Sequence, residues 1–103
     1  MNLRASVNRG DPQKIVFTFQ GDFSRFHLMK VKVLKTIESI ESGAVAFDLS
    51  GVPYLDSMGI ATLMDIHKKL KDRELRFEIL FPSPQIARIL KLVKVDGVLD
   101  IKE

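Results

Sequence analysis

The sequence predicts an α/β domain in which helices pack on a mixed five-stranded sheet. Short segments in which apolar and polar residues alternate, as in strands, are interleaved with longer segments whose apolar residues recur every three or four positions, as in helices. The expected order is strand, strand, helix, strand, helix, strand, helix, strand. Strands separated by helices run parallel, whereas the opening pair can form a hairpin. We expect residues 1–103 to form a single domain.

The chain opens with two strand patterns. Apolar and polar side chains alternate in residues 3–7, which predicts a half-buried strand, and the Asn, Gly, Asp and Pro residues of 8–12 predict a turn. Residues 15–20 alternate in the same way. They predict a second strand that pairs with the first and ends at Gly21.

The first helix is expected to begin after Ser24, a suitable N-cap, and to stop at Ser42 and Gly43. Its predicted apolar face consists of residues at helical spacing, namely Phe26, Met29, Val33, Leu34, Ile37 and Ile40. The apolar run 44–47 then predicts a buried strand that gives way to a polar turn at 48–50.

The C-terminal part of the chain, after a second helix, predicts a strand, a helix and a strand. Residues 75–80 alternate as a strand does. Ser83 can cap a third helix, because Pro84 suits the first helical position, where its missing N–H costs nothing. Gly97 is expected to close this helix ahead of a short last strand at 98–101.

Composition excludes several classes of protein. The chain is 46% apolar and 28% charged and has no cysteine, so neither a disulfide framework nor a cysteine metal site is possible. No apolar run is long enough to cross a bilayer, and no secretory signal is evident, so we expect a cytoplasmic protein without membrane insertion. The net charge of +3 is spread along the chain, which argues against direct nucleic acid binding.

Ser57 stands at the expected start of the second helix, Met58–Leu70, directly after a loop that contains a glycine and a proline. The first backbone N–H groups of a helix lack intrahelical acceptors and carry partial positive charge, so an anion is favoured there. Two interpretations follow. Either Asp56 or Ser57 is simply the N-cap, or Ser57 is a phosphoacceptor with Asp56 as its acidic neighbour and Gly59 leaving backbone accessible beside it.

These motifs resemble a known family. The run Asp48-Leu49-Ser50, then Asp56-Ser57-Met58-Gly59, an amphipathic helix and the strand pattern 75–80 together resemble the STAS domain, named for sulfate transporters and anti-sigma factor antagonists. The resemblance spans nearly the whole chain. Two departures are Ala61, where many antagonists have a second glycine, and Ser24, near which several have an acidic residue.

The resemblance implies partner switching. The unphosphorylated domain would bind an anti-sigma factor that is also a serine kinase, phosphorylation of Ser57 would end this binding, and a cognate phosphatase would restore it. An alternative is a non-switching STAS subunit of a lipid-transport ABC complex, which would dock to a membrane complex through the same loop and helix.

The partner surface is expected to surround Ser57. The candidate partner-binding residues are Phe23, Ser24, Tyr54, Asp56, Ser57, Met58, Gly59 and Thr62. Met58 is either a core contact or an exposed anchor, because methionine is common in both settings.

No catalytic or metal site is predicted. The two histidines, His27 and His67, lack partners at a typical metal spacing. Ser57 lacks the Gly-x-Ser-x-Gly setting of a nucleophile and an identifiable general base, and there is no glycine-rich phosphate loop. We therefore expect a protein that is not an enzyme and needs no cofactor.

Overall fold

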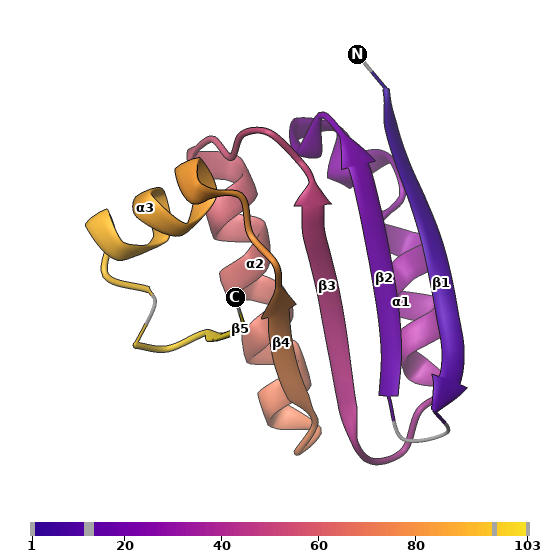
Figure 1. The fold of residues 1–103 in the computed structure, drawn as a ribbon. Coiled ribbons are helices and arrows are strands. Elements are labelled where there is room, and N and C mark those ends of the chain that lie inside the picture. Colours follow the sequence, from indigo (N-terminus) through magenta and orange to yellow (C-terminus); the bar gives the residue numbers. More distant parts are fainter. Residues whose placement is uncertain (1, 12–13, 96, 103) are drawn as a thin grey trace.

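The computed structural model describes residues 2–11, 14–95 and 97–102. In this part of the chain the strands form one sheet in sequential order (Figure 1). The strands are β1 (Leu3–Asp11), β2 (Lys14–Gly21), β3 (Ala44–Gly51), β4 (Arg76–Leu80) and β5 (Asp100–Lys102). β1 pairs with β2 antiparallel, and all the later neighbours are parallel, so the mixed five-stranded sheet predicted from the sequence is confirmed.

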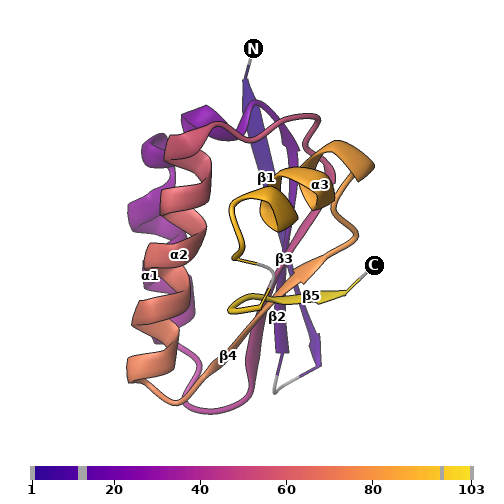
Figure 2. The same cartoon turned by 90° about the vertical axis from the view of Figure 1, so that its left-hand side faces the viewer.

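Helices connect the parallel strands. Figure 2 shows α1 (Lys30–Glu38) and α2 (Ser57–Asp72) side by side on one face of the sheet. The third helix, α3 (Pro84–Leu92), follows β4 and lies beyond its end, at the far side of the sheet from β1 (Figure 1). A short 3-10 helix, η1 (Phe23–Leu28), precedes α1.

Most of the core lies between the sheet and the helices α1 and α2, and two buried residues of α3, Ile86 and Leu90, also belong to it. Alternate residues of β2, β3 and β4 face the helices and are buried, namely Ile15, Phe17, Phe19, Val45, Phe47, Phe77 and Ile79. The phenylalanine rings of neighbouring strands pack against one another. The ring centroids lie 4.8 Å apart for Phe19 and Phe47 and 4.9 Å apart for Phe47 and Phe77. Such pairs add about 0.5–1.5 kcal/mol each beyond their area burial, which makes the centre of the sheet a firm support for the loops at its edge.

β1 differs from the prediction in length and burial. It continues through Asp11, so the turn expected at 8–12 is wrong for its described residues, and Pro12 lies outside them. Asn8 still pairs with Val16, and Asp11 pairs with Lys14 after a register irregularity. β1 is an edge strand, so one side of it faces water and polar residues are tolerated there. Neither Ala5 nor Val7 is buried.

The first helical segment is divided in two, whereas the sequence predicted one helix from Ser24 to Ser42. Asp22, not Ser24, is the cap: its carboxylate accepts the Ser24 backbone N–H at 3.0 Å and the Ser24 hydroxyl at 2.7 Å. This tight local bonding begins a 3-10 turn, and the α-helix starts only at Lys30. α1 ends at Glu38, so Ile40 lies beyond the helix. Its side chain is nevertheless buried.

The remaining elements begin close to where the sequence placed them. Ser83 caps α3 by accepting the Ile86 N–H, as predicted. α3 ends at Leu92 rather than at Gly97, because Val93 caps it. Lys94 then adopts a positive φ of 61°, and a right-handed helix cannot continue through that conformation. β3 extends to Gly51, so the polar turn expected at 48–50 is strand, and Asp48 pairs with Leu80.

Candidate functional site

Ser57 is the first residue of α2, and its side chain is exposed. The preceding residue, Asp56, has an extended backbone with φ −93° and ψ −177°, and its carboxylate accepts the backbone N–H of Gly59 at 2.7 Å. Asp56 is therefore the N-cap. The Ser57 hydroxyl makes no hydrogen bond to any other described residue, so it remains available for other chemistry.

Gly59 is buried, and the expectation that it leaves backbone accessible beside the serine is wrong. A Cβ added to Gly59 would lie 2.9 Å from Cδ2 of Leu55, 3.4 Å from Oδ1 of Asp56 and 3.5 Å from Cδ2 of Phe23. The absence of a side chain thus lets the first turn of α2 pack closely on its own loop and on η1.

Phe23 lies in the core, so the expectation that its side chain meets a partner is also wrong. It is 1% exposed, and its ring lies 5.4 Å from that of Phe19 and 5.1 Å from that of Phe26. The Phe23 side chain instead packs in the core between η1 and the first turn of α2. It supports the loop that presents Ser57 without reaching its surface.

Two large apolar side chains flank Ser57 in sequence and are exposed. Tyr54 is 61% exposed and Met58 is 70% exposed. The question left open for Met58 is therefore answered: it is not a core contact. Thr62, one turn further along α2, is half-buried, and Ser24 of η1 is exposed. Together with Ser57 and Asp56, which is half-buried like Thr62, these four residues define the accessible part of the predicted surface, which we call the Ser57 face.

Asp22 is a residue near this face that the sequence prediction missed. Hydrogen bonds from the Ser24 hydroxyl and then from the Ser24 backbone N–H lower the pKa of the Asp22 carboxyl, and desolvation opposes this shift. The loop after β2 therefore does contain an acidic residue, two positions before Ser24. Asp22 directly follows Gly21 and precedes a helical segment, and an aspartate in that position is a typical N-cap. This signal could have identified Asp22 from the sequence.

Further along α2, Asp65 connects the two helices that cover the sheet. Its Oδ2 lies 2.9 Å from Nζ of Lys30 on α1 and 3.2 Å from Nζ of Lys69 on α2. The hydrogen bond from Lys30 is the main cause that lowers the pKa of Asp65, with a smaller contribution from Lys69 and opposed by desolvation. These contacts link α2 to α1.

The described residues contain no group of three or more His, Cys, Asp or Glu side chains that could hold a metal ion. His27 lies in η1, where its Nδ1 is 3.1 Å from the Ser24 carbonyl oxygen. Among the helices in the described ranges, none is both long enough and apolar enough to span a membrane.

Taken together, these features define a class: a one-sheet α/β domain that presents an unpartnered serine at the start of its second helix, after the third strand. The family model of the STAS domain matches residues 5–103. The chain belongs to the STAS domain family.

Its relatives match nearly the whole of this chain. The anti-sigma-B factor antagonist of Listeria monocytogenes is 23% identical over 103 residues, which cover 99% of this chain and 90% of that protein. A solved anti-sigma factor antagonist from Mycobacterium paratuberculosis has a TM-score of 0.79 at 20% identity, over 98% of this chain and 86% of that one. The Bacillus cell fate determinant SpoIIAA is also similar. Its unphosphorylated form has a TM-score of 0.76 at 12% identity, over 97% of this chain and 89% of that one. Its phosphorylated form has a TM-score of 0.71 at 13% identity, over 97% and 92%.

Proposed function

We propose that this chain is a partner-switching regulator of the anti-sigma factor antagonist type. In its unphosphorylated form it binds an anti-sigma factor that is also a serine kinase, through the Ser57 face. Phosphorylation of Ser57 by that kinase ends the binding, and a cognate phosphatase restores it, all in the cytoplasm. The observation that carries the proposal is the exposed Ser57 hydroxyl, which Asp56 leaves free by capping α2 itself.

The relatives support this proposal. The Listeria protein is named an anti-sigma-B factor antagonist, and SpoIIAA is an anti-sigma factor antagonist with a phosphorylated form. The exposed Tyr54 and Met58 add apolar surface on both sides of the serine in sequence. Aromatic and methionine side chains are enriched at protein interfaces, so these two residues suit a docking surface.

The energies favour direct blocking of the interface over a change of fold. A phosphate adds about −1.5 to −2 charges, and a helix N-terminus stabilises a negative charge by only ~0.3–1 kcal/mol. The neighbouring Asp56 carboxylate repels the phosphate and offsets part of that gain. The net effect is small compared with a domain stability of about 5–15 kcal/mol.

Inside a partner interface the same charge is far more costly. An unpaired buried charge costs about 3–5 kcal/mol, and each 1.4 kcal/mol changes affinity about tenfold. Phosphorylation of Ser57 is therefore expected to weaken partner binding by about two to four orders of magnitude while the fold stays intact.

In vitro phosphorylation tests the proposal. The purified chain is incubated with its cognate kinase and ATP, and the modified residue is located by mass spectrometry. We expect one phosphate, on Ser57, and none on Ser57→Ala. Ser50→Ala is the matched control, because Ser50 is an exposed serine near the end of β3, the strand that leads into the loop before Ser57. Undiminished phosphorylation of Ser57→Ala would contradict the proposal.

A further inference from the structure

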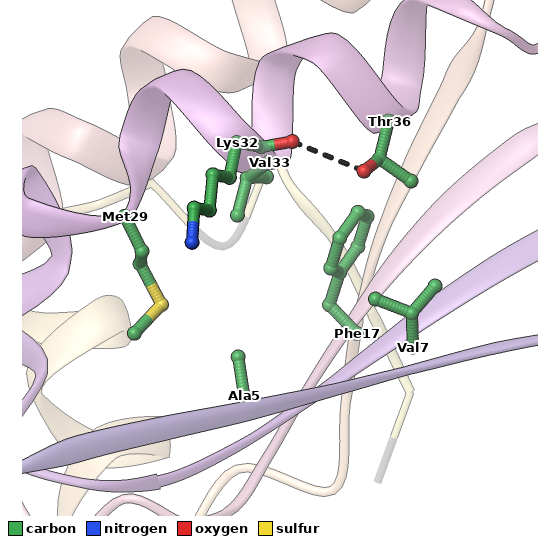
Figure 3. A pocket seen from close by; sticks show the side chains of 7 residues that line it. All are labelled: Ala5, Val7, Phe17, Met29, Lys32, Val33 and Thr36. Atoms are coloured by element: carbon green, nitrogen blue, oxygen red, sulfur yellow. Dashed lines mark hydrogen bonds between the residues drawn. The ribbon is translucent and has the colours of Figure 1, made fainter.

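A cavity of about 370 Å³ opens between the edge strand β1 and helix α1. Its walls are formed by Ala5 and Val7 of β1, Phe17 of β2, and Val33 and Thr36 of α1, with Met29 at the start of that helix (Figure 3). Neither α2 nor the loop before Ser57 contributes to it. The cavity is therefore separate from the Ser57 face, and its volume lies in the range of small-molecule sites.

The wall of this cavity is mostly apolar. Phe17 and Val33 belong to the buried core, whereas Val7 is 47% exposed and leaves apolar surface in contact with water. The Thr36 hydroxyl donates to the Lys32 carbonyl oxygen at 3.0 Å, so its polar group is already satisfied within the helix (Figure 3). A ligand with an apolar body would cover this surface without leaving polar groups unpaired.

Among the described residues that line this cavity, Lys32 is the charged one. Lys32 extends from α1 toward β1 on the same side as Met29 (Figure 3). Its ammonium makes no ion pair or hydrogen bond with any residue in the described ranges, whereas Lys30, two positions earlier, pairs with Asp65 at 2.9 Å. An apolar cavity beside an unpaired ammonium is complementary to an amphiphile with an anionic head.

The charge also argues against a second copy of this chain as the occupant. β1 has a free edge that could pair with the same strand of another molecule. That pairing would bring the Arg4 and Arg9 side chains of two β1 strands to the same edge. The like charges disfavour this arrangement.

We propose that this cavity binds a free fatty acid, with the alkyl chain against Phe17 and Val33 and the carboxylate beside Lys32. The apolar walls recognise the chain, and the ammonium selects a carboxylate over a neutral or cationic head of the same length. This site is independent of the proposed partner switch, because it shares no residue with the Ser57 face.

Titration of the intact chain with sodium laurate, below the concentration at which it forms micelles, tests this site. Methyl NMR spectra are expected to show saturable shifts for Ala5, Val7 and Val33, and calorimetry is expected to give one site per chain. Dodecyltrimethylammonium, which has the same chain length and a cationic head, should bind at least about threefold more weakly. The site is refuted if laurate causes no saturable shifts at these methyls, or if the cationic amphiphile binds as tightly.

A pair of matched variants tests the role of Lys32. Lys32→Met keeps the apolar stem and should weaken laurate binding about three- to tenfold, with little effect on dodecanol. Lys35→Met removes a charge from the same helix but does not line the cavity, and it should change laurate binding by less than about 1.5-fold. Equal losses for the two variants would refute the carboxylate contact. Methyl shifts that follow protein concentration without laurate would instead mean that a second copy fills the cavity.

Discussion

Asp56 caps α2, and this leaves the hydroxyl of the neighbouring Ser57 exposed. For single residues, the proposed switch depends on this difference in role between two adjacent side chains: one caps the helix and the other stays free. A helix needs one cap, and a serine that served as the cap would have its oxygen turned toward the backbone N–H groups. Because the aspartate accepts the Gly59 N–H, the serine is free to be modified without loss of the cap.

Removing the two side chains should therefore have different effects on stability. Asp56→Ala loses the cap and should lower the free energy of unfolding by about 1 kcal/mol, whereas Ser57→Ala should change it by less than about 0.5 kcal/mol. Urea denaturation followed by circular dichroism measures both. Asp56→Asn is the control, since its amide oxygen can still cap the helix. A larger loss for Ser57→Ala than for Asp56→Ala would mean that the serine is the cap.

Met58 should matter for binding and not for folding. Met58→Ala is expected to weaken binding to the anti-sigma factor by about 1–2 kcal/mol, because an exposed apolar anchor loses its contact area with the partner. The free energy of unfolding should change by less than about 0.5 kcal/mol. Leu92→Ala is the matched control: Leu92 is 73% exposed on α3, outside the Ser57 face, and should leave affinity unchanged. Equal effects on affinity would contradict the placement of the interface.

At the scale of elements, the Asp65 contacts to Lys30 and Lys69 join α2 to α1. Because the pKa of Asp65 is lowered in the folded chain, its ionised form stabilises the fold at pH values above its ordinary pKa of 3.8. That contribution should be lost as the pH falls below 3.8 and through the lower pKa of the folded state.

Unfolding of the wild type and Asp65→Asn across pH 2.5–7 checks this contribution, which for such a partly exposed pair is about 0.2–1 kcal/mol. The wild type should be the more stable form near neutral pH, and the two should converge at the acid end. Lys30→Gln should remove most of the same difference, because Lys30 is the main cause of the pKa shift. A gap between the two proteins that widens in acid would be inconsistent with the ion pair.

The sequence predicted the elements whose pattern is local and missed those that depend on tertiary context. The alternation in β2 and the cap of α3 depend on nearby residues, and both were predicted correctly. The burial expected for Ala5 and Val7 depends on how closely a helix covers the edge strand, and a cavity lies there instead. Likewise, the apolar residues of η1 have the spacing of an α-helix. The segment forms a 3-10 helix instead, which begins with the local hydrogen bonds from Ser24 to Asp22.

The same distinction applies to the candidate site. The position of Ser57 at a helix start follows from sequence, because a loop, an acid and a helical pattern occur in order. The burial of Phe23 and Gly59 does not follow from sequence, since it depends on η1 packing under the first turn of α2. Sequence reasoning therefore identified the serine and placed part of its supporting shell on the surface.

At the scale of the whole molecule, the sheet and its Phe-rich core act as a fixed support for one modifiable surface. Ser57→Asp should fold as the wild type does, with an unchanged circular dichroism spectrum and a free energy of unfolding within about 1 kcal/mol, because a single charge at a helix start alters stability little. Ser57→Asn is the neutral control of similar size. A loss of the fold in Ser57→Asp alone would mean that the switch acts through structure.

The most direct test compares the affinity of the unmodified chain and of the chain stoichiometrically phosphorylated on Ser57 for the cognate anti-sigma factor, by calorimetry with matched folded-state spectra. We expect identical spectra and binding that is about a hundredfold or more weaker after phosphorylation. Binding within about twofold of the unmodified chain would contradict it.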